Sequence, residues 1–122
     1  MKTLTALIVF AAACVTLSFA RSPTGTKVYS TAEAKNHVGE LASVVGIVEQ
    51  VSSSNKGTQF LNFDGKYPDA PFTAVVFKSD ASAVGDVKKY EGKRVTVTGK
   101  ITLYHGTPEI IVRSADALKA EG

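Results

Sequence analysis

Cysteine and histidine are scarce in this sequence, which has one cysteine, Cys14, and two histidines, His37 and His105. Because Cys14 lies in an apolar N-terminal stretch, the remaining chain can form no disulfide, thiolate nucleophile or cysteine metal site. The spacing motifs of serine hydrolases, zinc peptidases and phosphate-binding loops are absent, and the acidic residues are scattered singly. We therefore expect a protein that is not an enzyme and that holds no metal and no cofactor.

The chain also has only one long apolar run and only a small excess of positive charge. The only long apolar run is Leu4 to Leu17, which follows Met1-Lys2 and precedes the small residues Ser18 and Ala20. This pattern predicts a signal peptide over residues 1–20, cleaved after Ala20, and the run is short for a membrane anchor. A lipoprotein anchored at Cys14 is a weaker alternative, because Ala11 stands where such signals usually carry leucine.

Removal of the signal would leave 102 residues, enough for one domain. Of 14 Lys and Arg, Lys2 would be lost, so 13 would face 11 Asp and Glu, a net charge of +2. Such a mild excess does not bind polyanions by itself, and nucleic-acid binding would need a local site. We expect export to the periplasm or the medium, a flexible leader over 21–29 and a single domain over 30–122.

Alternating β-branched and polar residues predict five strands, over Glu40 to Val51, Thr58 to Asp64, Phe72 to Lys78, Val95 to Leu103 and Glu109 to Arg113. A capping box at Ser30 to Glu33 predicts a short helix over Thr31 to His37, ended by Gly39. A second helix is compatible with Ala81 to Tyr90, although Gly85 weakens it.

The segment Gly39 to Val48 matches Gly92 to Ile101 without gaps, and each copy carries a central glycine, Gly46 or Gly99. A glycine inside a long strand marks a bulge or bend, so the match predicts two equivalent corners of a small barrel. The fold class expected is all-β, a five-stranded OB-fold Greek-key barrel. An SH3-like barrel is the alternative, but it lacks the long crossing between the third and fourth strands.

The ordered segments HVGE, FLNF, KYPDAPFTAVVF, YEGKRVTVTGKI and YHGTPEIIV resemble the small exported OB-fold proteins of bacteria that are described as nucleic-acid-binding. Similar domains are appended to exported nucleases. The resemblance covers about Ala34 to Leu118 and implies an OB-fold and a ligand on its outer face. OB-folds bind DNA, RNA, oligosaccharides and proteins on the same surface, so the resemblance implies the fold more firmly than the ligand.

Ligands of OB-folds lie across the second and third strands, between the loop at 52–57 and the turn at 104–107. Base stacking needs aromatic rings and phosphate binding needs cations. The candidate binding residues in this region are Lys56, Phe60, Asn62, Tyr67, Phe72, Lys78, Tyr104, His105 and Arg113. Alternation suggests that Leu61, Phe63, Val75 and Phe77 are core, and it leaves open whether Phe60 and Phe72 face the core or the ligand. The basic run Lys88-Lys89 and Lys93-Arg94 is expected to be a solvated face on the crossing side.

The leading hypothesis is a non-enzymatic binder of single-stranded DNA or RNA that stacks bases on aromatic rings and contacts a few phosphates. The near-neutral charge favours an alternative, an envelope module that binds a protein, an oligosaccharide or a small ligand. A third hypothesis is an accessory domain that works with an exported nuclease. The oligomeric state does not follow from the sequence.

Overall fold

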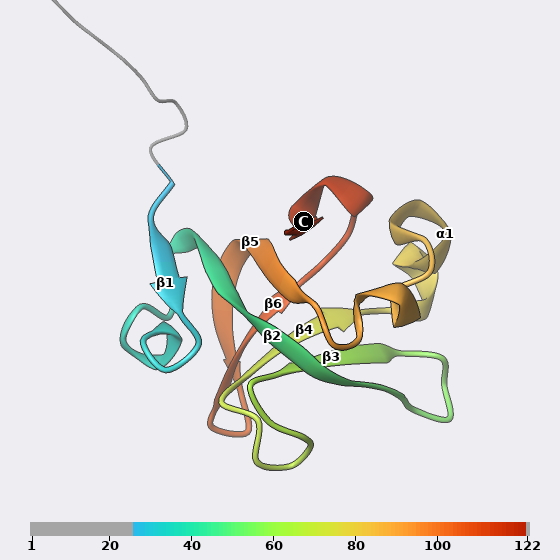
Figure 1. The fold of residues 1–122 in the computed structure, drawn as a ribbon, viewed down its shortest axis with the longest axis horizontal. Helices are drawn as coiled ribbons and strands as arrows, with labels where there is room; N and C mark the ends of the chain where they lie inside the picture. The colour runs from blue at the N-terminus through green and yellow to red at the C-terminus, as the bar shows by residue number, and fades with distance from the viewer. Residues whose placement is uncertain (1–25, 122) are drawn as a thin grey trace, which may run out of the picture.

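The computed structural model describes residues 26–121, which form a mostly β domain built on a closed five-stranded barrel (Figure 1). The predicted signal peptide, Cys14 and residues 21–25 of the predicted leader lie outside the described residues. The strands are β1 (Val28–Ser30), β2 (Leu41–Ser53), β3 (Gln59–Phe63), β4 (Phe72–Val76), β5 (Arg94–Tyr104), β6 (Thr107–Ile111) and β7 (Leu118–Ala120). The sheet order β1-β2-β3-β4-β6-β5-β7, closed by a β2–β5 pairing, confirms the expected all-β barrel of the OB type.

Two long strands turn the corners of the barrel by changing partners along their length. The first half of β2, to Ile47, pairs with β5, and its second half pairs with β3 across a register shift. In β5 the partner changes from β2 to β6 after Lys100. Gly46 and Gly99 lie beside these changes, and a Cβ at Gly99 would stand 2.6 Å from Ile110 Cγ2. The glycines are therefore needed where the sheet folds onto itself, as the internal match predicts.

The core is aliphatic with two phenylalanines. Phe63 and Phe72 are fully buried and pack edge to face, with ring centroids 5.4 Å apart. Phe72 was expected among the binding residues, and the structure instead places it inside the barrel. Phe77 was expected in the core, but it follows the end of β4 and is 39% exposed. Val75 is buried as expected, although it lies outside the main core cluster.

Helical structure is shorter than the sequence suggests. Instead of a helix over Thr31 to His37 there is a 3₁₀ turn, η1 (Ala34–Asn36), preceded by the predicted capping box. In that box the Ser30 backbone N–H donates to Glu33 Oε1 at 2.9 Å, and the Glu33 N–H donates to Ser30 Oγ at 3.2 Å. The crossing forms α1 (Ala81–Val84), which Gly85 ends with φ 87°, flanked by 3₁₀ helices η2 (Lys78–Asp80) and η3 (Lys88–Tyr90).

Two short strands were not expected. Val28 and Tyr29, assigned to the flexible leader, belong to β1, which pairs in parallel with Ser43 to Val45 of β2. After a last 3₁₀ helix, η4 (Ala115–Ala117), β7 pairs with Val95 to Val97 of β5. Three-residue strands carry too little periodicity to be predicted, and their pairing depends on the barrel edge that receives them.

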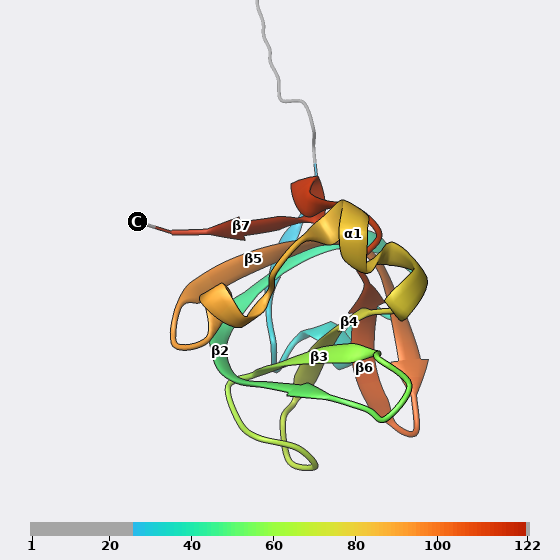
Figure 2. The same cartoon turned by 90° about the vertical axis from the view of Figure 1, so that its right-hand side faces the viewer.

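The arrangement leaves one face of the barrel wall open. Figure 2 shows α1 at the end of the barrel opposite the connection between β3 and β4. Val84 and Val87, from α1 and the turn after it, contribute to the core. The outer surface of β3, β4 and β6 is left between the β5–β6 hairpin and the connection over residues 64–71.

Candidate ligand-binding groove

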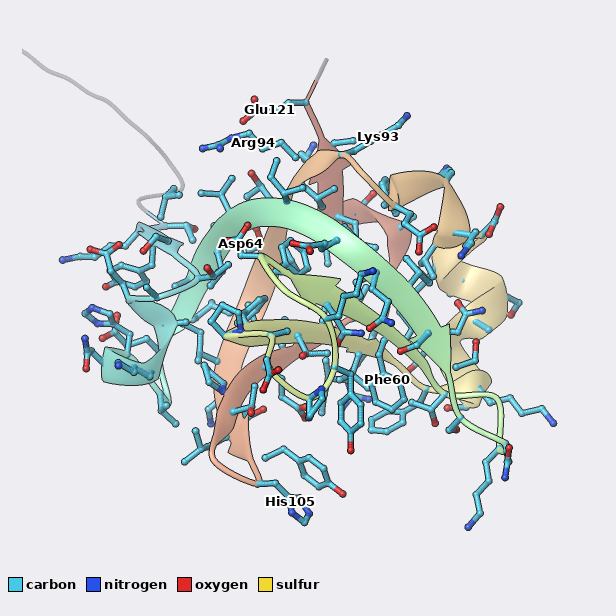
Figure 3. The ribbon with its side chains drawn as sticks, turned by 60° about the horizontal axis from the view of Figure 1, so that its bottom comes forward. Phe60, Asp64, Lys93, Arg94, His105 and Glu121 are labelled. Atoms are coloured by element: carbon cyan, nitrogen blue, oxygen red, sulfur yellow. The ribbon has the colours of Figure 1, made fainter. Side chains whose placement is uncertain are left out.

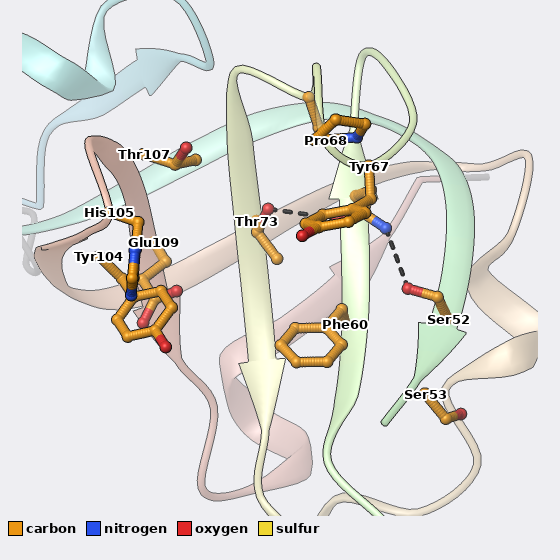
Figure 4. Close-up of a pocket in the computed structure, with 12 residues that line it drawn as sticks. Ser52, Ser53, Phe60, Tyr67, Pro68, Thr73, Tyr104, His105, Thr107 and Glu109 are labelled. Carbon is orange, nitrogen blue, oxygen red and sulfur yellow. Dashed lines mark hydrogen bonds between the residues drawn. The ribbon is translucent and has the colours of Figure 1, made fainter. Parts of the chain in front are cut away.

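A groove of about 620 Å³ lies on the outer face of β3, β4 and β6 (Figure 4). Its volume is in the range of small-molecule sites. We call it the aromatic groove, and it is lined by Ser52, Ser53, Phe60, Asn62, Tyr67, Pro68, Ala70, Thr73, Tyr104, His105, Thr107 and Glu109. In Figure 4, Tyr104 and His105 lie on one side, Phe60 and Tyr67 on the other, and Thr73 between them.

One wall is the β5–β6 hairpin. Tyr104 pairs with Thr107, so the loop consists of His105 and Gly106, with φ of 50° and 82°. Positive φ at both loop residues is the type I′ pattern, whose twist matches that of the strands. The Tyr104 side chain is 62% exposed and contacts the His105 ring edge to face, with centroids 4.1 Å apart. The tight turn thus presents two aromatic rings to solvent on a short, well-defined loop.

The other wall is the connection between β3 and β4. Its Tyr67 is 78% exposed, yet the Tyr67 backbone N–H donates a 2.9 Å hydrogen bond to Gln50 Oε1 on β2. A second bond, from the Asp69 N–H to the Lys66 carbonyl at 2.7 Å, closes the turn around Pro68. The backbone that carries Tyr67 is therefore tied to the barrel while its ring stays free.

Asn62 forms part of the groove floor, and it is almost wholly buried. Its amide nitrogen donates to Gln50 Oε1 at 3.0 Å and to Ser52 Oγ at 3.2 Å. Its Oδ1 accepts a 3.3 Å bond from the Thr73 hydroxyl (Figure 4). These bonds use both amide hydrogens, and Gln50 links the network to Tyr67. Its partners lie on β2 and β4, so Asn62, one of the candidate binding residues, is held by its side-chain bonds in the groove floor.

The charge of the groove comes from Glu109 on β6. Burial raises the pKa of the Glu109 carboxyl above its ordinary value. Within residues 26–121, no Lys or Arg lines the aromatic groove. Lys56 lies in the β2–β3 turn, and the Lys78 side chain packs against Gly57 of that turn, where an added Cβ would be 3.1 Å from Lys78 Cδ. Arg113 follows the end of β6 and does not line the groove.

The structure thus brings together five of the nine sequence candidates: Phe60, Asn62, Tyr67, Tyr104 and His105. Phe72 is core, and the three cations Lys56, Lys78 and Arg113 lie outside the cavity. The sequence reasoning missed seven lining residues: Ser52, Ser53, Pro68, Ala70, Thr73, Thr107 and Glu109. Glu109 had a usable signal, because it alternates with the apolar residues Pro108 and Ile110, both buried, and so must face outward.

The basic run lies away from the groove. Lys93 and Arg94 are at the opposite side of the barrel from Phe60 and His105 in Figure 3. Lys88 Nζ is 3.0 Å from Glu91 Oε1, and Arg94 Nε is 3.1 Å from Glu121 Oε2. These exposed pairs agree with the expected solvated face.

Residues 26–121 contain no cluster of three or more His, Cys, Asp or Glu that is arranged to hold a metal ion. In the same part of the chain, no helix has the length and apolar character needed to cross a membrane.

Comparison with known proteins supports the fold. No protein-family model matches the sequence, and no curated protein matches it either. Among solved structures, an aspartyl-tRNA synthetase from Leishmania major Friedlin matches with a TM-score of 0.52 and 11% identity. This match covers 81% of the present chain but 21% of the synthetase. An aspartyl-tRNA synthetase from Entamoeba histolytica gives a TM-score of 0.49 and 18% identity, over 82% of this chain and 23% of that one. The chain therefore spans about a fifth of the first of these proteins and shares its local backbone arrangement.

Proposed function

We propose that this domain binds single-stranded nucleic acid in the aromatic groove. The observation that carries the proposal is the pair of exposed tyrosines, Tyr67 and Tyr104, which project from opposite walls of one preformed groove. Tyrosine rings at such positions supply stacking faces, and stacking on an aromatic side chain is worth about 1–3 kcal/mol per base. Phe60 on β3 and His105 in the β5–β6 hairpin supply two more aromatic rings that line the same groove.

The charge distribution indicates how a strand would lie. Glu109 repels phosphates, so the bases occupy the groove and the phosphates lie toward its ends or outside it. Lys56 and Lys78 stand by the β2–β3 turn, beyond the end of the groove where Ser53 and Phe60 lie. Few phosphates are neutralised in this arrangement, and stacking supplies most of the affinity. We further propose that the protein works without catalysis and, after removal of the signal peptide, outside the cytoplasm.

The test is a salt titration of oligonucleotide binding, followed by fluorescence anisotropy on the 21–122 protein. Single-stranded DNA and RNA are both required as probes, since the Leishmania protein that shares this fold is named for tRNA. For single strands the logarithm of the binding constant falls by about 0.7 per phosphate contact for each tenfold rise in salt. We expect a shallow slope, equivalent to two or three contacts. A protein that binds neither DNA nor RNA even at low ionic strength would refute the proposal.

A second candidate, binding of an uncharged oligosaccharide, is favoured by the polar groups of the groove. Ser52, Thr73, Thr107 and Glu109 offer hydroxyls and a carboxylate, and the lining includes no cation among the described residues. Sugar rings also pack on aromatic faces. A neutral glycan array at fixed and varied salt separates the two candidates, because glycan affinity is insensitive to ionic strength.

Glu109 gives a prediction that discriminates between the ligands. Because its pKa is raised, this carboxyl takes up a proton at higher pH than an ordinary glutamate, while Glu33, Glu40 and Glu91 have lowered pKa values and stay charged. As pH falls through the pKa of Glu109, the repulsion of phosphates is lost. We expect oligothymidine to bind about twofold to tenfold more tightly below that pKa. This is the effect of removing one negative charge at roughly 8 Å from a phosphate.

The variant Glu109→Gln should bind oligothymidine at neutral pH about twofold to tenfold more tightly than the wild type, and its affinity should rise less than that of the wild type as the pH falls. Oligothymidine is the suitable probe because its bases do not take up protons in this pH range. If Glu109→Gln instead weakens binding of a neutral glycan and leaves oligothymidine unbound, the second candidate is correct.

A further inference from the structure

A second hollow adjoins the aromatic groove. It has a volume of about 270 Å³ and is lined by Thr31, Ala32, Lys35, Ala70, Pro71, Gly106, Thr107 and Pro108. Ala70 and Thr107 line both spaces. It is smaller than the range of typical ligand pockets, but it is much larger than the roughly 30 Å³ that one water occupies.

The same two walls bound both spaces. The β5–β6 hairpin lines the groove with Tyr104 and His105 and the hollow with Gly106 and Pro108. The β3–β4 connection lines the groove with Tyr67 and Pro68, and it lines the hollow with Pro71. The two spaces are therefore successive parts of one path along the surface. The path begins at the aromatic rings of the groove and ends at the segment before β2.

That end of the path is firmly held. The Thr31 hydroxyl donates a 2.6 Å hydrogen bond to Asp64 Oδ2, and Asp64 Oδ1 accepts a 3.0 Å bond from the Ile47 backbone N–H. Ala34, the neighbour of Lys35, is completely buried in the core. Lys35 thus extends from a turn that is fixed on the barrel.

Lys35 carries the only positively charged side chain among the described residues that line either space. No ion pair joins Lys35 to an acidic side chain within residues 26–121. The path therefore has a carboxylate, Glu109, beside the stacking rings and an ammonium group at its far end. A base stacked in the groove and a phosphate at Lys35 would match this order of charges.

We infer that the second hollow is a subsite for one backbone phosphate of the bound strand, held by Lys35. This inference rests on the proposed function and adds to it the direction in which the nucleic acid lies. The bound nucleic-acid strand continues past Thr107 and Ala70 toward η1. One phosphate is fixed beyond the hairpin, and the next bases lie on Tyr104 and Tyr67.

The first test compares salt slopes for oligothymidine binding. Lys35→Gln should lower the slope by about 0.7, the value of one phosphate contact on a single strand. Lys119→Gln is the matched control, since Lys119 is exposed on β7 and lines neither space. A slope in Lys35→Gln equal to that of the wild type, or an equal fall in both variants, would overturn the inference.

The second test removes single charges from the ligand. Oligothymidines that carry one uncharged methylphosphonate linkage, moved stepwise along the strand, should bind the wild type about twofold to fivefold more weakly at each contacted position, as expected for exposed ion pairs. At one of these positions the linkage should have no effect on Lys35→Gln, so the two changes are non-additive there. Equal effects in both proteins would refute the subsite while the proposed function stands. Failure of the wild type to bind any oligonucleotide would instead refute the proposed function.

Discussion

Replacing Tyr67 and Tyr104 together by alanine should weaken oligonucleotide binding by at least about thirtyfold. Each ring offers a stacking face worth about 1–3 kcal/mol per base. Both side chains are mostly exposed, at 78% and 62%, so their removal takes little from the core. Exposed substitutions of this kind usually change the free energy of unfolding by less than about 0.5 kcal/mol. The loss of affinity should therefore occur in a protein of nearly normal stability.

The measurement is fluorescence anisotropy with single-stranded DNA and RNA, with thermal unfolding recorded for each variant. The matched control is Tyr67→Phe with Tyr104→Phe, which keeps both rings and removes both hydroxyls. This control should bind within a few-fold of the wild type, because stacking depends on the ring face. If the alanine and phenylalanine variants lose affinity equally, the hydroxyls and not the rings hold the ligand.

The second large effect concerns stability. Phe72→Ala should lower the free energy of unfolding by about 3–5 kcal/mol, the usual cost of removing a buried phenylalanine. Phe72 is fully buried and packs edge to face on Phe63. Domains of this size are stabilised by about 5–15 kcal/mol in total, so this one substitution removes a large share. The variant is expected to unfold at a markedly lower temperature.

Phe60→Ala is the matched variant, because Phe60 lies on the neighbouring strand but lines the aromatic groove. Phe60→Ala should weaken oligonucleotide binding about tenfold, and it should lower the free energy of unfolding by clearly less than Phe72→Ala does. Urea unfolding and oligonucleotide binding are measured on both proteins. Equal losses of stability would contradict the assignment of the two rings to opposite faces of the barrel wall.

The barrel could be predicted from local patterns. Alternating β-branched residues located the five main strands, and the matched glycines located both corners. The capping box at Ser30 and Glu33 forms as the sequence indicates, although the turn after it stays 3₁₀. Such features depend on residues that are close together in the sequence, so they can be predicted without a structure.

The choice between the two faces of β3 and β4 could not be predicted in the same way. Alternation fixes which residues share a face, but both faces of these strands carry large apolar side chains, such as Phe60 and Phe63. Phe63 and Phe72 face each other directly across the β3–β4 pair, so they share one face, and their full burial shows that this face is the inner one. For this reason Phe72 was wrongly grouped with the binding residues.

By itself the sequence determined the class of fold, the places where the strands bend and the aromatic content of the binding region. Only the tertiary structure decided which of those rings meet in one groove, and it added Glu109 beside them and Lys35 at the end of the path. These two charges lie 74 positions apart in the chain. They line adjoining spaces because η1 packs next to the β5–β6 hairpin once the barrel has closed. Strand closure is a long-range event, so no local pattern records it.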